Sequence, residues 1–266
     1  MSHAGERVVV EHYRSTPEQY LIYLFHRISY RFAAPYTEGR EVLDYGCGSG
    51  YGSADIAVGA TRVVGVDVSH EAIEHARANF SAPGLEFAPI EAERPLSFPD
   101  QSFDTVLSFQ VIEHVRDPDR YLSEARRVLR LGGHFVLATP DRRTRLFPTQ
   151  RPWNRWHVTE YSERALRRTL APHFSQIEVL GMTGRQDVID IELRRTRRAR
   201  WLTLPATLPL YPDRLRVRLL EQVQRLREAR AGESAGEPQS YDFDESALRI
   251  ASGVRPSVNH VVVARR

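Results

Sequence analysis

The sequence contains no lysine and a single cysteine, Cys47, among its 266 residues. One cysteine excludes an intrachain disulfide, which is typical of proteins in a reducing compartment, so we expect a cytoplasmic location. No apolar run approaches the roughly 20 residues that a membrane-spanning helix requires. The longest apolar run near the N-terminus covers only residues 21–25, which is too short for a secretory signal. The sequence therefore predicts a globular protein without a membrane span.

Because lysine is absent, all 37 basic residues are arginine, and they exceed the 34 acidic residues to give a net charge of +3. The excess is local: the segment from Arg185 to Arg230 holds twelve arginines and six acidic residues. That segment carries +6 and the rest of the chain −3. Such a stripe is typical of a solvated helix face, and an RNA-binding surface is the alternative, because arginine pairs well with phosphates.

Short apolar segments alternate with amphipathic ones over most of the chain. A first helix is predicted at Pro17–Ala34, beginning at the cap Thr16 and ending before Pro35. The expected strands are Glu41–Tyr45, Arg62–Val66, Leu85–Ala88, Thr105–Phe109, His134–Thr139, Gln176–Leu180 and Val258–Ala264. The expected helices between them are Tyr51–Val58, Glu71–Asn79, Asp119–Leu129 and Glu163–Leu170. This alternation predicts a doubly wound α/β fold with a mostly parallel sheet covered on both faces.

Three glycines, Gly46, Gly48 and Gly50, lie directly after the first strand and before a helix. Glycine allows a tight turn and a close approach of a ligand to the backbone, although the same pattern also suits dinucleotide-binding proteins. Asp67 follows Gly46 by 21 residues and ends the second strand, where a carboxylate can accept both hydroxyls of a ribose. The alternative is that Asp67 caps the following helix, but Ser69 can do so equally well.

Further motifs follow the glycines. Asp44 lies two residues before the first of them, where it can organise the loop around an ammonium group. Residues 102–107 lead into the segment Gln110–Val115, and Arg127–Phe135 precedes a strand that ends at Thr139-Pro140. Together these motifs resemble the class I S-adenosylmethionine-dependent methyltransferases, especially the group that includes the ubiquinone-type O-methyltransferases. The resemblance covers about Val42 to Leu180.

The resemblance implies S-adenosylmethionine as the cofactor and a seven-stranded sheet whose last strand is antiparallel. It also implies a set of cofactor-binding residues: Asp44, Gly46, Gly48, Gly50, Asp67, Val68, Glu91, Ala92, Phe109 and Gln110. In relatives the glycines pass under the methionine portion, Asp44 lies near its amino group and Asp67 holds the ribose. Val68 would lie against the adenine.

Two further positions carry over in the same way. The acidic residue that meets the adenine amino group falls at Glu91 or its neighbour Ala92, where most relatives have aspartate. Phe109 and Gln110 would lie beside the sulfonium. The chain then divides into an N-terminal helical cap (1–40), a cofactor-binding core (41–184), an arginine-rich helical insertion (185–256) and a final core strand (257–266). The insertion, which includes a polar linker at Gly232–Gln239, would serve as a lid or as a homodimer element.

Glu113, His114 and His157 are the candidate catalytic residues on the acceptor side. A hydroxyl acceptor needs a general base or a cation that lowers its pKa, so we expect either a histidine base or a divalent metal site formed by these three residues. Purely structural roles are the third possibility. The set resembles the metal-dependent small-RNA terminal 2′-O-methyltransferases, in which two glutamates and two histidines hold Mg²⁺. Here Gln110 occupies the first glutamate position.

A second resemblance bears on the acceptor. The segments Phe25–Ala33 and Trp153–Tyr161 are similar to methyltransferases of glycan assembly, in which aromatic residues could stack on sugar rings. The sequence thus predicts an O-methyltransferase for a small molecule or oligosaccharide that contains sugar. An RNA methyltransferase is the alternative, although no RNA-binding module is apparent and a nucleic-acid partner is not expected. A non-catalytic cofactor-binding regulator is the third hypothesis.

Overall fold

The computed structural model describes residues 16–92, 94–210, 212–231 and 240–266, without the side chains of 223, 224 and 226–231. The predicted linker Gly232–Gln239 and the first fifteen residues of the N-terminal cap lie outside this description.

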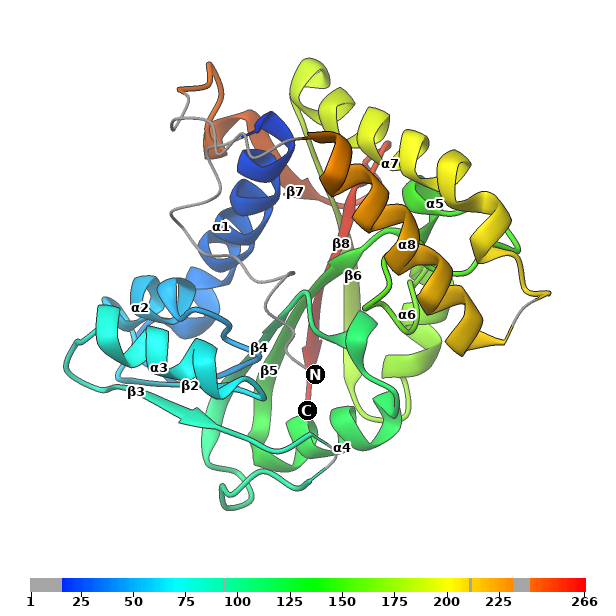
Figure 1. The fold of residues 1–266 in the computed structure, drawn as a ribbon. Coiled ribbons are helices and arrows are strands. Elements are labelled where there is room, and N and C mark those ends of the chain that lie inside the picture. The colour runs from blue at the N-terminus through cyan, green and yellow to red at the C-terminus, as the bar shows by residue number, and fades with distance from the viewer. Residues whose placement is uncertain (1–15, 93, 211, 232–239) are drawn as a thin grey trace.

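An eight-stranded sheet with the order β3-β2-β1-β4-β5-β8-β6-β7 forms the centre of the molecule (Figure 1). Its strands are β1 (Glu41–Tyr45), β2 (Arg62–Asp67), β3 (Leu85–Pro89), β4 (Phe103–Phe109), β5 (Leu129–Pro140), β6 (Ser175–Gly184), β7 (Leu248–Ala251) and β8 (Asn259–Arg265). The first five strands in this order pair in parallel. The last strand, β8, is antiparallel to both neighbours, β5 and β6. The predicted α/β class and the antiparallel final strand are therefore confirmed.

The predicted count of seven strands is low by one. The additional strand, β7, pairs antiparallel with β6 and lies within the segment predicted to be a helical insertion. It consists of only four residues, of which Leu248 alone is buried, so it lacks the length and alternation that mark a strand in sequence. A Cβ on Gly184 would lie 2.2 Å from the carbonyl oxygen of Ala247, so this close approach of the chain requires glycine at the end of β6.

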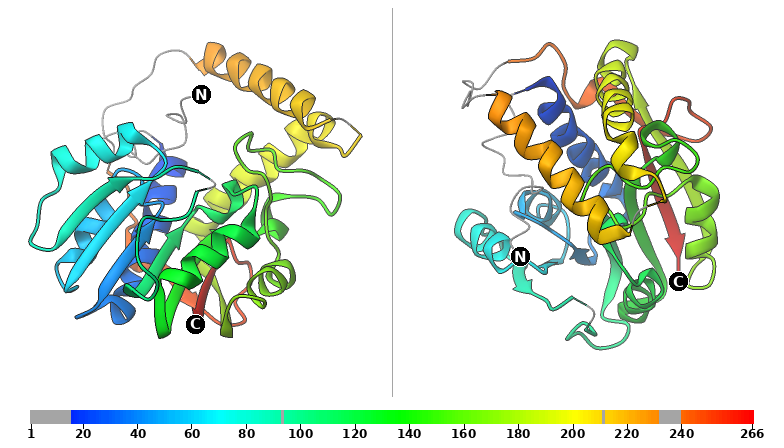
Figure 2. Two further views of the ribbon diagram at one scale, coloured as in Figure 1. Left: turned by 90° about the horizontal axis from the view of Figure 1, so that it is seen from below. Right: turned by 45° about the vertical axis from the view of Figure 1, so that its right-hand side comes forward.

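Helices cover both faces of the sheet (Figure 2). They are α1 (Pro17–Thr37), α2 (Tyr51–Ala57), α3 (His70–Asn79), α4 (Pro118–Val128), α5 (Arg142–Arg145), α6 (Glu163–Leu170), α7 (Gln186–Thr207) and α8 (Asp213–Ala231), with short 3-10 helices η3 (Ile112–His114) and η4 (Glu245–Ala247). Neighbouring strand residues point to opposite faces. Val42 packs in a core with α1, α2 and α7, whereas Leu43 packs in a core with α4 and α6.

The first helix begins as predicted and ends later. Thr16 caps α1 by accepting a hydrogen bond from the backbone N–H of Gln19. The predicted end before Pro35 is wrong, because α1 continues to Thr37. A long-range contact supports this last turn: the Thr105 hydroxyl of β4 donates to the carbonyl oxygen of Tyr36 at 2.5 Å. Pro35 has no N–H to donate to the carbonyl oxygen of Arg31, and the bond from Thr105 pairs a different carbonyl, one of those that a helix end leaves without an intrahelical partner.

A helical hairpin, α7 followed by α8, lies beside the sheet (Figures 1 and 2). The first turn of α7 buries Val188 and Ile189 in the same core as α1. Within the described ranges no helix is both long and apolar enough to cross a membrane. The fold thus leaves the carboxyl ends of the parallel strands at one edge, where ligands of open α/β sheets bind.

Candidate cofactor and acceptor sites

The glycine loop turns sharply at the carboxyl end of β1. The backbone N–H groups of Gly46 and Cys47 both donate to the carbonyl oxygen of Val66 in β2, at 2.8 and 3.0 Å. Gly46 has a φ of +98°, and a Cβ there would lie 2.4 Å from Cγ2 of Val111. The loop therefore lies directly on the segment that follows β4, a geometry that only glycine permits at this position.

Asp44 is fully buried beneath this loop. Its Oδ2 accepts hydrogen bonds from the hydroxyls of Tyr30, at 3.0 Å, and Ser53, at 2.6 Å. Its Oδ1 is buried and has no hydrogen-bond partner among the described residues. Burial raises the pKa of Asp44 to about 6, although the two hydroxyls oppose this shift. An unpaired buried carboxylate oxygen is costly unless a ligand donates to it, so the arrangement fits an ammonium group.

Asp67 lies at the carboxyl end of β2, beside the loop. Its Oδ2 accepts a hydrogen bond from the backbone N–H of Gly48 at 3.0 Å, and its Oδ1 accepts one from that of Ser69 at 2.8 Å. Ser69 is the cap of α3, since its hydroxyl accepts from the N–H of Ala72. Asp67 is therefore not the cap of this helix. Each carboxylate oxygen can accept a further bond from a ribose hydroxyl.

The residues expected near adenine follow β2 and β3. Val68 is 47% exposed, and a large apolar side chain at this edge offers a surface to a flat ring. The backbone N–H of Ile90 donates to the carbonyl oxygen of Asp67 at 3.0 Å. Glu91 and Ala92 directly follow Ile90 and therefore lie near the end of β2. Both are exposed, and the Glu91 carboxylate forms an ion pair with Arg94 at 3.0 Å. Recognition of an adenine amino group by Glu91 would compete with that pair.

Phe109 and Gln110 end β4 next to the glycine loop. Phe109 is buried and meets the Tyr30 ring edge to face, with 4.8 Å between the ring centroids. Gln110 has a φ of +58°, which is uncommon for a residue with a side chain and recurs at functional sites. The backbone N–H of Gln110 donates to the carbonyl oxygen of Ala138 at 2.8 Å, which holds this turn against β5.

Glu113, His114 and His157 converge on one place, as predicted, and we refer to them as the acceptor-side cluster. One potential ligand atom from each lies within 4.8 Å of the others. The first two residues lie on η3, after β4. His157 is brought there by its neighbours, because the backbone N–H groups of Val158 and Thr159 donate to the carbonyl oxygen of Glu113 at 2.8 and 3.2 Å. The two imidazole rings meet edge to face, with centroids 4.8 Å apart.

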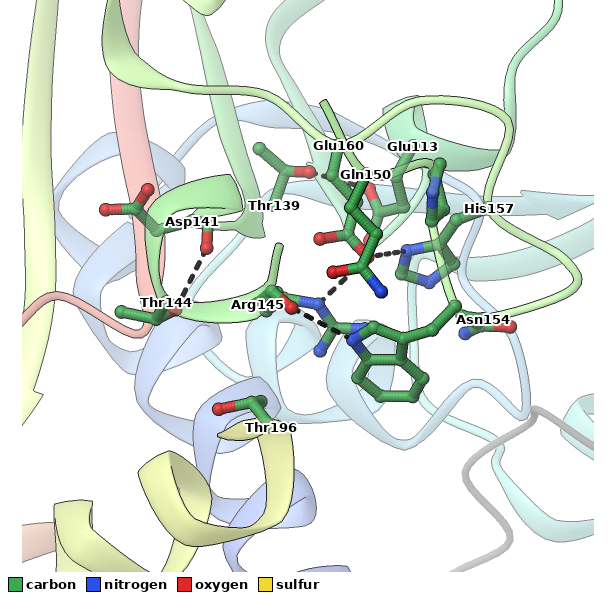
Figure 3. A network of polar contacts seen from close by, with 12 residues as sticks. Glu113, Thr139, Asp141, Thr144, Arg145, Gln150, Asn154, His157, Glu160 and Thr196 are labelled. Atoms are coloured by element: carbon green, nitrogen blue, oxygen red, sulfur yellow. Dashed lines mark hydrogen bonds and ion pairs between the residues drawn. The ribbon is translucent and has the colours of Figure 1, made fainter. Parts of the chain in front are cut away.

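Hydrogen bonds fix both imidazoles. Nδ1 of His114 bonds to the carbonyl oxygen of Trp156 at 3.2 Å. Nδ1 of His157 bonds to Oε1 of Glu160 at 3.1 Å, as Figure 3 shows. Both partners are acceptors, so Nδ1 carries the proton and Nε2 the lone pair in each neutral ring. Burial opposes ionisation of Glu160, but Arg145, at 3.0 Å, and His157 outweigh it and lower the pKa of that carboxyl.

The side chain of Glu113 is fully buried beside β5. Its Oε2 accepts a hydrogen bond from the hydroxyl of Thr139 at 2.9 Å. Its Oε1 is buried and has no hydrogen-bond partner in the part of the chain that the structure describes. The acceptor side thus repeats the feature found at Asp44: a buried carboxylate with one oxygen bonded to a hydroxyl and one oxygen ready for a ligand.

Comparison with known proteins agrees with this geometry. The sequence profile of the methyltransferase domain family matches residues 43–137. A probable S-adenosylmethionine-dependent methyltransferase of Mycolicibacterium smegmatis is 36% identical over 170 residues, which is 64% of this chain and 65% of that protein. Residues 43–137 thus match the methyltransferase domain family, and the chain is similar to S-adenosylmethionine-dependent methyltransferases. The chain spans slightly less than two thirds of that relative's length.

Two other comparisons extend this assignment. The methyltransferase domain is also 37% identical over 107 residues to a ubiquinone biosynthesis O-methyltransferase of Caulobacter, covering 40% of this chain and 42% of that protein. A solved S-adenosylmethionine-dependent methyltransferase of Mesorhizobium loti superposes with a TM-score of 0.52 over 90% of this chain and 96% of its own, at 17% identity. At that identity the superposition shows the fold alone.

Several residues that complete the candidate site were not predicted from the sequence: Tyr30, Ser53, Thr139, Arg145 and Glu160. Tyr30 and Ser53 hold Asp44, Thr139 holds Glu113 and Glu160 holds His157. Arg145 acts one step further away, because it donates to Glu160. Hydroxyl and charged side chains of these types occur throughout the chain, so no local pattern marks any of the five except Glu160. A useful signal was Glu160, which follows His157 by three residues within a short loop.

The aromatic residues of the segment Trp153–Tyr161 make packing contacts within the protein, which limits how many of them can contact a ligand. The guanidinium of Arg145 stacks on the Trp153 ring at 4.4 Å, and the indole N–H of Trp153 donates to the carbonyl oxygen of Arg145. Tyr161 is buried in the core. Trp156 is half-buried, and the guanidinium of Arg155 lies 4.6 Å from its ring centroid. Of the three aromatic residues, Trp156 therefore best retains the predicted role in acceptor binding.

Proposed function

We propose that this protein transfers a methyl group from S-adenosylmethionine to a hydroxyl oxygen, and that the acceptor-side cluster binds that hydroxyl. The observation that carries the proposal is the buried Oε1 of Glu113, which lacks a partner among the described residues and lies beside two oriented imidazoles. The cluster follows β4, at the same edge of the sheet as Asp44 and Asp67. Cofactor and acceptor would thus meet at one edge.

The cofactor half of the site fits S-adenosylmethionine. Asp44 would accept from its ammonium group, the glycine loop would pass under its methionine portion, and Asp67 would hold its ribose. Val68 and the residues at 91–92 would contact the adenine, and Phe109 and Gln110 would border the sulfonium. Bound there, the cofactor would supply a methyl group activated by the positive sulfur.

The acceptor half of the site would supply a base that makes the hydroxyl of the acceptor more nucleophilic. An alcohol is a weak nucleophile until its proton is removed, and a positioned base contributes about 10²–10⁴-fold to such a transfer. Nε2 of His114 or His157 would take the proton as the hydroxyl oxygen bonds to the methyl carbon and the sulfur–methyl bond breaks. Glu113 would accept a hydrogen bond from the acceptor or stabilise the resulting imidazolium. Alignment of the oxygen behind the methyl group would contribute further.

A divalent cation in the cluster is the second candidate mechanism. Three ligand atoms within 4.8 Å of one another, with each Nδ1 held by an acceptor, are typical of a metal site with a defined outer shell. Two imidazoles and one carboxylate suit Mn²⁺, Fe²⁺ or Zn²⁺ better than Mg²⁺, which prefers oxygen ligands. Donor chemistry therefore argues against the predicted Mg²⁺, and a cation would lower the pKa of the acceptor hydroxyl instead of a base removing its proton.

For the acceptor we propose a molecule that contains sugar. The resemblance to glycan-associated methyltransferases supports this class, and Trp156, whose carbonyl orients His114, offers an indole on which an apolar sugar face can pack. Relatives named as O-methyltransferases support transfer to oxygen. An RNA acceptor is the competing class, and a tRNA U34 carboxymethyltransferase is among the proteins with similar sequence.

Turnover with a panel of sugars, oligosaccharides and bulk RNA tests the proposal. We expect methylation of a sugar hydroxyl, loss of turnover in His114→Ala and His157→Ala, and unchanged binding of S-adenosylhomocysteine. His75→Ala, on α3, is the matched control and should retain activity. Loss of turnover with chelator and its restoration by Mn²⁺ would identify the cation mechanism. Full activity in both cluster variants would refute the site, and turnover of RNA alone would refute the sugar acceptor.

A further inference from the structure

The turn of the helical hairpin exposes large apolar side chains. Trp201 and Leu202 near the end of α7 are 59% and 53% exposed, Leu210 in the connection is 78% exposed, and Leu215 at the start of α8 is exposed as well. We call these four residues the hairpin tip. The connection lies at the periphery of the molecule, at the end of the hairpin (Figure 2). Exposed apolar residues that gather in one place mark an interaction surface.

Arginines flank the hairpin tip. Arg194, Arg197 and Arg198 are exposed, and their spacing to Trp201 and Leu202 places all five residues on one face of α7. No ion pair with another described residue engages these three arginines. From Arg194 onward the outer face of α7 is therefore basic, and it is apolar where it approaches the turn; Asp190 and Asp187 lie one and two turns before Arg194 on the same side.

The hairpin tip is also preformed. The Trp201 ring meets the Phe147 ring edge to face, with centroids 4.8 Å apart. The side-chain amide of Gln150 donates to the carbonyl oxygen of Arg200 at 2.9 Å and to the hydroxyl of Thr207 at 2.8 Å. These contacts fix the last turns of α7, so a partner would not have to order this part of the surface.

We propose that the hairpin tip docks on an anionic lipid bilayer. The leucines would enter the boundary between headgroups and acyl chains, and the indole of Trp201 would lie at headgroup level, where amphipathic rings concentrate. The three arginines would contact lipid phosphates, and basic residues near an anionic surface each contribute measurably to binding. This surface is separate from the proposed methyl-transfer site, and the inference does not depend on the acceptor.

The alternatives fit the surface less well. A twofold contact centred on the arginines would bring like charges together, and one centred on the apolar turn would leave the arginines of both copies without anionic partners. RNA would engage the arginines but leave Leu202 and Leu210 exposed, since bases stack on aromatic rings and phosphates pair with cations. An anionic bilayer satisfies both the apolar turn and the basic flank.

Flotation with lipid vesicles tests this docking in the full-length protein. We expect binding to phosphatidylcholine vesicles that contain about 30% phosphatidylglycerol, weaker binding at high salt, and little binding to phosphatidylcholine alone. Leu202→Ser and Leu210→Ser should each weaken binding by about tenfold. The pair Arg197→Gln and Arg198→Gln should weaken it about tenfold and remove most of the salt dependence. Val58→Ser is the control, since Val58 is 91% exposed but lies after α2, and it should bind normally.

Binding of S-adenosylhomocysteine by each variant checks that it remains folded. Absence of binding to the anionic vesicles would refute the inference, and so would equal binding by Leu202→Ser and Leu210→Ser. Two other results would assign the surface elsewhere and also refute it. They are a dimer in solution that these substitutions dissociate, without vesicle binding, and binding of RNA that the arginine substitutions abolish while vesicles do not compete.

Discussion

Asp44 gives the most direct test of the cofactor site. Burial raises its pKa from 3.8 to about 6 in the folded protein. Between those values the folded protein binds more protons than the unfolded chain, so the free energy of unfolding falls as pH rises through this window. At 1.36 kcal/mol for each pKa unit, the loss approaches ~3 kcal/mol above pH 6. The carboxylate that we propose to bind the cofactor thus destabilises the ligand-free protein at neutral pH.

The substitution Asp44→Asn removes this pH dependence. An asparagine keeps an oxygen for Tyr30 and Ser53 but cannot ionise. The buried amide N–H₂ of the asparagine lowers the free energy of unfolding by an amount that does not change with pH. The pH dependence of the difference in unfolding free energy between variant and wild type therefore reports the ionisation of Asp44 alone. We expect the variant to gain about 3 kcal/mol relative to wild type between pH 4 and pH 7, measured by urea unfolding. Calorimetry should show S-adenosylhomocysteine binding at least about tenfold weaker than in wild type, without the strengthening through pH 6.

Asp141 provides a matched control of opposite sign. It is also buried, but His260 and Arg143 outweigh the effect of burial and lower its pKa. Asp141→Asn should therefore lose stability relative to wild type as pH rises through the ordinary range of aspartate. A difference between Asp44→Asn and wild type that stays constant from pH 4 to pH 7 would refute the reasoning. Unchanged cofactor affinity in a folded Asp44→Asn variant would refute the ammonium contact.

Three further predictions concern neighbouring positions. Asp67→Ala should weaken S-adenosylhomocysteine binding by about tenfold in calorimetry, and unchanged affinity would reject its contact with the ribose. Gly46→Ala should abolish cofactor binding because its Cβ would lie 2.4 Å from Val111. The added change Val111→Ala should restore binding in part, and no recovery would show that the clash with Val111 is not the cause of the loss. Glu160→Gln should lower turnover and move the acidic limb of the pH–rate profile to lower pH, because the amide no longer stabilises a protonated His157. An unchanged acidic limb of the pH–rate profile would show that Glu160 has a purely structural role.

Local signals in the sequence determined much of the fold and pointed to the residues that we propose bind the cofactor. The strand Glu41–Tyr45 and the helix Glu163–Leu170 have the predicted bounds, because each has a clear hydrophobic period and flanking turn or cap residues. Ser69 caps the helix after Asp67, as its side chain allowed. Glycines that must turn directly after a strand are recognisable without tertiary information, because their conformation is a property of the residue itself.

Contacts between distant segments decided the rest. The sequence proposed His157 beside Glu113, but only the backbone bonds from residues 158 and 159 to the Glu113 carbonyl bring it there. The last turn of α1, beyond Pro35, is bonded to Thr105 in another element, and the short strand β7 is formed by pairing with the end of β6. The unpaired oxygen of Asp44 likewise results from burial under α1 and the glycine loop. Periodicity and turn residues report local conformation, whereas burial and long-range hydrogen bonds depend on which segments the folded chain brings together.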